Sequence, residues 1–160
     1  MDPLYFIIFG AVILVAIYLT YYFVSKQLEK DHLIVQQIKN ILEQYGKLDE
    51  NGHHPKFTFN EQSYYVKFLK IKPNVKFKFN SKTIWEKRFS GKVQYTDQTV
   101  FSKLPGRKLV IIYPSEGPFM YQYDENEIKF TTPKTKVWDY VVIPYNELEE
   151  VLKEGIKWVY

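Results

Sequence analysis

Five lysines in one short stretch are the residues best placed for chemistry, because together they could bind an anion. The stretch from Lys56 to Lys92 has ten basic and two acidic residues, whereas the segment from Ser115 to Tyr160 has five lysines and nine acids. This polarity produces a field that attracts anions. The lysines flank the turn signal Lys72-Pro73-Asn74, so we expect them to form a basic surface around one β-hairpin. They are Lys67, Lys70, Lys72, Lys76 and Lys78.

The first candidate ligand of this basic surface is the anionic leaflet of a membrane, to which each nearby lysine adds about 1 kcal/mol of attraction. Nucleic acid is the competing polyanion, because Tyr64, Phe68 and Phe77 lie among the lysines and could stack on bases. Half of these aromatic residues must face the core of a sheet, however, and no recognisable nucleic-acid-binding motif is present. Nucleic acid is therefore not the expected partner. A structural interpretation stays open, in which the lysines only keep edge strands soluble.

A second group of residues could support phosphodiester cleavage with a metal ion. Glu127 and Lys129 are two residues apart, and Glu116 lies eleven residues before Glu127. Two carboxylates that hold Mg²⁺ beside a lysine are suitable for that reaction. The Glu-x-Lys spacing is common by chance, and Asp124-Glu125-Asn126 predicts a hairpin turn here. A metal-dependent nuclease is therefore the alternative rather than the first hypothesis.

The sequence contains few residues that could bind other cofactors or act in covalent catalysis. His53 and His54 could bind a metal with Asp49 or Glu50, but adjacent side chains diverge in an extended loop. The chain has no cysteine and three histidines, and it contains no Gly-rich phosphate loop and no Gly-x-Ser-x-Gly motif. We therefore predict no cofactor and favour binding over catalysis.

The elements that position these residues begin with a long apolar run. Residues 4–24 contain no charged residue and no proline, and a helix of this length matches a hydrocarbon core of about 30 Å. We predict a transmembrane helix there, preceded by a short tail at residues 1–3. A cleaved signal peptide would have a basic N-terminal region and a small-residue cleavage site, and the sequence shows neither.

The flanking charges predict the orientation of this helix. The N-terminal side has Asp2 and no basic residue, whereas Lys26, Lys30 and Lys39 follow the apolar run. The positive-inside rule therefore places the N-terminus outside and the C-terminal domain in the cytoplasm. The absence of cysteine is consistent with a reducing compartment.

Residues 25–47 predict an amphipathic helix. Ile34, Ile38 and Ile41 recur at helical spacing, Leu42 lies on the same face, and Gly46 is a plausible C-terminal cap. We expect this helix to pack on the following domain and to continue from the transmembrane helix. A short coiled-coil stalk is the alternative, although two heptads are few for one.

Residues 55–160 predict a small soluble α+β domain. A short helix is expected at 96–104, capped by Thr96. A last helix is expected after Asn146, which with Glu149 forms a variant of the capping box, and Lys153 and Lys157 lie near its end. The element order favours a mixed or antiparallel sheet flanked by an N-terminal and a C-terminal helix. The predicted strands are 56–59, 64–71, 75–79, 109–113, 119–123, 127–132 and 137–143.

The sequence thus predicts a single-pass membrane protein whose cytoplasmic domain is a non-enzymatic interaction module. Its expected partner is anionic lipid or another protein, contacted through the basic hairpin. The first alternative is a membrane-tethered metal-dependent nuclease or an inactive relic of one. The second is an accessory subunit of a membrane complex, in which Gly10 and Ala11 offer a small-residue contact patch without a GxxxG motif.

Overall fold

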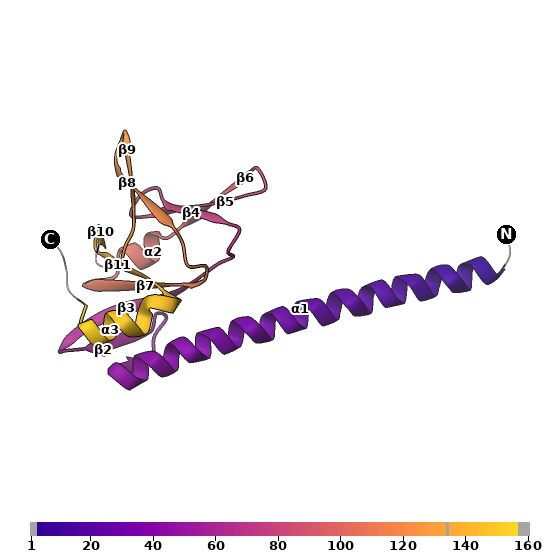
Figure 1. Cartoon of the computed structure of the whole chain (residues 1–160), viewed down its shortest axis with the longest axis horizontal. Helices are drawn as coiled ribbons and strands as arrows, with labels where there is room; N and C mark the ends of the chain where they lie inside the picture. The colour runs from indigo at the N-terminus through magenta and orange to yellow at the C-terminus, as the bar shows by residue number, and fades with distance from the viewer. Residues whose placement is uncertain (1–2, 134, 157–160) are drawn as a thin grey trace. The chain divides into compact units, whose positions relative to one another are not determined.

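The computed structural model describes residues 3–133 and 135–156, and it confirms the α+β class (Figure 1). One long helix precedes two mixed β-sheets and a C-terminal helix. The chain divides into two compact units, Met1–Gln36 and Gln37–Tyr160. The last positions of the predicted domain, including Lys157, lie outside the described residues.

The long helix α1 spans Pro3–Tyr45 without a break, as expected from the absence of any helix breaker in this stretch. From Ile8 onward it is long and apolar enough to cross a membrane, and its most apolar part is not buried. Large apolar side chains such as Phe9, Leu14 and Phe23 are more than 60% exposed. The core helix of a soluble protein would bury such residues, whereas a membrane span and an N-terminal signal sequence both have this composition.

The last turns of α1 belong to the second unit and bury one face there. Ile38 and Leu42 are fully buried, and the N–H of Gly46 donates to the carbonyl of Leu42 at 2.9 Å. The helix therefore ends where the sequence predicts. A Cβ atom at Gly46 would lie 2.3 Å from the carbonyl oxygen of Thr58, so only glycine allows this close approach of helix end and strand.

Six strands form the first sheet, in the order β1-β2-β3-β7-β11-β10. The central pairs β3/β7 and β7/β11 are parallel, and the outer pairs are antiparallel. Six consecutive residues of β7 are buried, as the continuous apolar run at 109–113 predicts. The strands are β1 Lys47–Asp49, β2 Lys56–Phe59, β3 Gln62–Ile71, β7 Arg107–Pro114, β10 Lys136–Val137 and β11 Tyr140–Pro144.

Five strands form the second sheet, in the order β6-β5-β4-β8-β9. Parallel neighbours such as β3/β7 and β7/β11 need crossover connections, which are usually helices. Here the first connection forms β4, β5, β6 and the short helix α2 (Thr99–Ser102), and the second includes β8 and β9. The two connections meet where β4 pairs in parallel with β8. The strands are β4 Lys76–Phe79, β5 Ile84–Phe89, β6 Lys92–Asp97, β8 Phe119–Asp124 and β9 Glu127–Phe130.

The two sheets share a core that is dominated by aromatic rings. Trp85 lies in its middle, with ring centroids 4.9 Å from Phe79, 5.8 Å from Tyr140 and 6.4 Å from Phe101. The hydroxyl of Tyr140 donates to the carbonyl of Lys82 at 2.6 Å, which satisfies its polar end inside the core.

Three local predictions are wrong. Thr96 belongs to β6, and Asp97 instead accepts the backbone N–H of Thr99 at the start of α2. The run at 137–143 forms two strands, because Trp138 adopts a positive φ and turns the chain between β10 and β11. Asn146 does not cap the last helix, because a 3-10 turn η1 (Tyr145–Glu147) comes first and α3 (Leu148–Glu154) begins without a side-chain cap.

Candidate functional site

The predicted basic hairpin is wrong, because β3 and β4 do not pair. β3 lies between β2 and β7 in the six-stranded sheet, and β4 lies between β5 and β8 in the five-stranded sheet. The connection makes a tight turn, with the N–H of Val75 donating to the carbonyl of Lys72 at 3.0 Å, but the chain then enters the other sheet. The five predicted lysines are therefore divided among three environments.

The first environment is a cavity of about 390 Å³ at the ends of β3 and β5, here called the cationic cavity. It brings together Lys70 and Lys72, which the sequence predicts, and Lys87, which it does not. Apolar atoms form the rest of the wall, and none of the six described lining residues is acidic. The lining residues are Lys70, Ile71, Lys72, Val75, Lys87 and Phe89.

Lys87 is the residue of the cationic cavity that sequence reasoning missed. On β5, Lys87 is two residues after Trp85 and two before Phe89, so the three side chains lie on the same face of the strand. Its ammonium donates to the carbonyl of Lys70 at 3.1 Å. Burial and the neighbouring charge of Lys70 lower the pKa of Lys87. The alternation Trp-x-Lys-x-Phe is the sequence signal that could have placed Lys87 on the inner face.

The second environment is the aromatic core, into which Lys67 points. Its ammonium lies 5.2 Å from the ring centroid of Phe101 and 5.9 Å from that of Trp85. Burial lowers the pKa of Lys67. Lys67 makes no ion pair with a carboxylate among the residues that the structure describes. It is thus stabilised by cation–π contacts and is separate from the cationic cavity.

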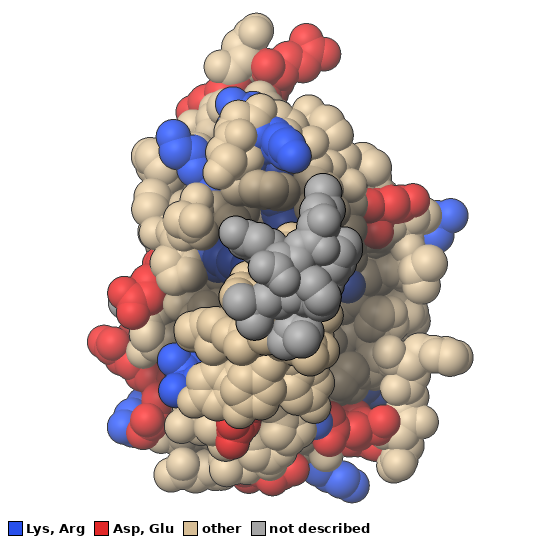
Figure 2. All heavy atoms as spheres, turned by 90° about the vertical axis from the view of Figure 1, so that its right-hand side faces the viewer, with Lys and Arg blue, Asp and Glu red and all other residues tan. Residues whose placement is uncertain are grey.

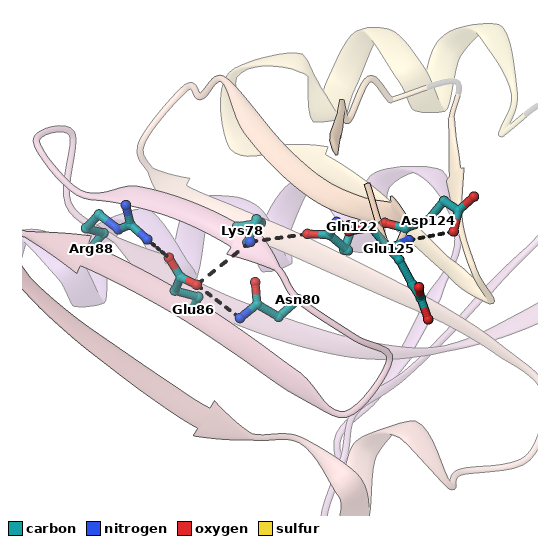
Figure 3. Close-up of polar contacts among 7 residues, drawn as sticks. All are labelled: Lys78, Asn80, Glu86, Arg88, Gln122, Asp124 and Glu125. Atoms are coloured by element: carbon teal, nitrogen blue, oxygen red, sulfur yellow. Dashed lines mark hydrogen bonds and ion pairs between the residues drawn. The ribbon is translucent and has the colours of Figure 1, made fainter. Parts of the chain in front are cut away.

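The third environment is the outer face of the five-stranded sheet, where Lys76 and Lys78 line a groove of about 200 Å³. Figure 3 shows the polar contacts beside them. Glu86 is 5% exposed. Its carboxylate accepts hydrogen bonds from the guanidinium of Arg88 at 2.9 Å and from the side-chain amide of Asn80 at 3.0 Å, and the ammonium of Lys78 lies 3.9 Å from it. We call these four residues, Lys78, Asn80, Glu86 and Arg88, the Glu86 cluster. The carboxylate of Glu86 partly neutralises the positive charge of this cluster.

The structure does not bring the predicted nuclease residues together. Glu127 begins β9 beside the tip of the β8–β9 hairpin, where it pairs with Lys129 at 3.3 Å. Glu116 precedes β8 at the opposite end of that hairpin. The whole of β8 lies between Glu116 and the turn that leads to Glu127, and the two belong to no group of three or more metal-ligating side chains among the described residues.

The histidine pair is likewise not arranged as a metal site. Glu50 pairs with Lys39 at 2.6 Å, and Asp49 accepts the N–H of Asn51 at 3.0 Å. The ring of His54 lies 5.4 Å from that of Phe101. Within residues 3–133 and 135–156, no group of three or more His, Cys, Asp or Glu side chains could hold a metal ion.

The face of the molecule that Figure 2 draws has mixed charge. Figure 2 shows basic and acidic side chains interspersed on the face that it draws, with acidic ones gathered at its top. In Figure 1 the turn between β8 and β9 lies at that height. The cationic cavity differs from this surface in its chemistry, because three lysines and three apolar residues line it and no acidic residue is among the described lining residues.

The chain matches no protein-family model, no curated protein and no solved structure. Three amines around an apolar hollow can hold a phosphate or carboxylate group through charge-assisted hydrogen bonds.

Proposed function

We propose that the protein is a membrane-anchored, non-enzymatic module whose cationic cavity binds the phosphate group of anionic phospholipids. Lys70, Lys72 and Lys87 hold the phosphate, and Ile71, Val75 and Phe89 contact the apolar part of the lipid. The observation that carries this proposal is the convergence of three lysines on one cavity with no acidic residue in its lining.

The electrostatics of the cavity support an anionic ligand. Burial and the charge of Lys70 already disfavour the protonated form of Lys87, as the lowered pKa of Lys87 indicates. An anion placed between the ammonium groups offsets this repulsion and replaces some of the lost hydration. A neutral ligand of the same shape would gain neither effect.

The anchor supports a ligand that is part of the membrane. The exposed apolar residues of α1 and the lysines that follow them suit a single span with the C-terminal domain in the cytoplasm. The cytoplasmic leaflet is the anionic one. Tethering also raises the effective concentration of headgroups around the domain, so weak individual contacts suffice.

Lysine acetylation of the full-length chain in nanodiscs tests this proposal. We expect Lys70, Lys72 and Lys87 to be acetylated several-fold more slowly in discs that contain phosphatidylserine than in discs of phosphatidylcholine alone, as measured by mass spectrometry. Because the protection is electrostatic, it should diminish as salt is raised. Lys92 and Lys103, which lie on the exposed surface, serve as internal references.

Two further measurements distinguish lipid binding from binding of a free anion: a pair of lysine variants and a control with inorganic phosphate. Lys87→Met should remove the protection of Lys70 and Lys72, whereas the matched variant Lys92→Met should keep it. Protection by inorganic phosphate alone, to the same extent in neutral discs, would assign the cavity to a free anion. Equal acetylation in both kinds of disc would refute lipid binding.

A further inference from the structure

The outer face of the five-stranded sheet is a surface that no described residue covers. Residues paired across neighbouring strands share a face, so one row runs through all five strands. It begins with Tyr95 on β6 and ends with Phe130 on β9, which are 60% and 63% exposed. Glu86, Lys78 and Met120 lie between them.

Further apolar residues enlarge this surface on both sides of the row. Val93 pairs with Arg88 and is 43% exposed, and Ile128 pairs with Gln122 and is 52% exposed. A single exposed apolar residue on a domain is ordinary, but here exposed apolar residues on both edge strands flank a central charged cluster on one face, which suits an interaction site.

The charges on this face are divided between two places. Three cations, Lys76, Lys78 and Arg88, line the groove and have one carboxylate, Glu86, among them. The exposed turn between β8 and β9 carries three acids, Asp124, Glu125 and Glu127. Figure 3 shows that Gln122, which accepts the ammonium of Lys78 at 3.3 Å, also lies beside this turn.

We propose that this face binds the same face of a second copy of the chain, with a two-fold axis passing near Ile128. A two-fold interface requires a surface that is complementary to itself. Here the acidic turn of one copy meets the basic groove of the other, and the apolar residues cover each other. The two-fold axis forms this contact between acidic turn and basic groove twice, which favours a second copy over an unrelated partner.

Disulfide cross-linking of the full-length chain tests this interface without a background, because the chain has no cysteine. Ile128→Cys lies beside the proposed axis and should form a disulfide-linked dimer in most of the oxidised protein. Val100→Cys is the matched control, because Val100 is 74% exposed but lies on α2. Association through α1 alone would link both variants equally and would overturn the proposal, as would a failure of Ile128→Cys to cross-link.

A charge exchange then tests the pairing itself. In the Ile128→Cys background, Lys76→Glu and Glu125→Lys should each lower the dimer yield several-fold, because each places like charges together. A mixture of the two variants should restore the yield, since every contact then joins opposite charges. Unchanged yields, or a mixture no better than its components, would contradict the pairing, and circular dichroism confirms that each variant is folded.

Discussion

The two sheets of this domain differ in how fully they are buried. The six-stranded sheet has covered inner strands, and β7 and β11 are buried along almost their whole lengths. The five-stranded sheet buries one face only, and its edge strands β6 and β9 are exposed at nearly every residue. The five-stranded sheet therefore contributes its inner face to the shared core, whereas its outer face is free to present a binding surface.

Lysines of this domain also differ in how their positive charge is accommodated. In the six-stranded sheet, Lys108 is 1% exposed and its ammonium is bound by the carboxylate of Asp139 and the carbonyl of Gly106. In the five-stranded sheet, Lys87 faces a cavity and Lys78 faces a groove. A buried charge must be paired, but a charge beside an opening can be paired by a ligand. This difference separates structural lysines from candidate binding lysines.

Truncation of one apolar residue in each sheet should give the largest contrast. Ile111→Ala, in the fully buried part of β7, should lower the free energy of unfolding by about 2–5 kcal/mol, because it removes packed atoms and leaves a cavity. Val93→Ala, on the exposed edge strand β6, should change it by less than about 0.5 kcal/mol. Denaturant unfolding of both variants measures the contrast, and equal losses would contradict the division between the sheets.

Removal of one carboxylate from each sheet should give the next largest effect. Asp139→Asn leaves the ammonium of Lys108 buried without a counter-charge and should lower the free energy of unfolding by about 3 kcal/mol. Glu86→Gln keeps a hydrogen-bond acceptor, and its partner Arg88 is exposed to water, so we expect a loss of about 1 kcal/mol or less. Thermal unfolding at two salt concentrations distinguishes them.

A second lysine that pairs with Asp139 provides a control for this prediction. Lys82 lies 3.2 Å from the carboxylate of Asp139 but is half exposed. Lys82→Met should therefore cost much less than Asp139→Asn. If both variants lose the same stability, the contribution comes from the surface pair rather than from burial of Lys108.

The parts of the fold that the sequence predicts are those with local signals. The apolar run at 109–113 predicts a strand buried on both faces, and the pattern of Phe77 and Phe79 predicts their inward orientation; burial confirms both. The strand Lys92–Asp97 was missed, because Val93 and Tyr95 are exposed and apolar residues on that face do not signal burial. The alternation of residues along a strand shows which side chains share a face. It does not show which of the two faces packs against another element.

The assignment of strands to two sheets depends on information that the sequence does not show. Lys72-Pro73-Asn74 has the composition of a hairpin turn, yet the chain leaves one sheet there and enters another. Only the long-range pairings β3/β7 and β4/β8 decide this outcome. The spacing of the lysines in the sequence therefore could not show that Lys70 and Lys72 line one cavity while Lys76 and Lys78 line another groove.

Two glycines extend the comparison to backbone geometry. Gly46→Ala should cost about 2 kcal/mol or more, because its Cβ would clash with the backbone of Thr58 in the six-stranded sheet. Gly91, in the turn between β5 and β6, has open space around it but a φ of +74°, so Gly91→Ala should cost about 1 kcal/mol. Chemical denaturation of both variants checks the order, and the reverse order would contradict it.

The smallest effect concerns protonation of His54, which precedes β2 and whose ring lies 5.4 Å from that of Phe101. Burial, followed by the charges of Lys67 and His53, lowers the pKa of His54 from 6.5. The unfolded chain then binds more protons in the window just below pH 6.5, so the free energy of unfolding falls as the pH drops through that window. His54→Gln should flatten this part of the stability profile.

Lys67 provides the test of the physical cause. Lys67→Met removes the positive charge beside His54 but keeps an apolar side chain against Phe101 and Trp85. The NMR titration midpoint of His54 should therefore rise towards 6.5, whereas Lys92→Met, on β6, should leave it unchanged. An unchanged midpoint in Lys67→Met would assign the lowered pKa of His54 to burial and to the charge of His53, and would exclude the charge of Lys67 as a cause.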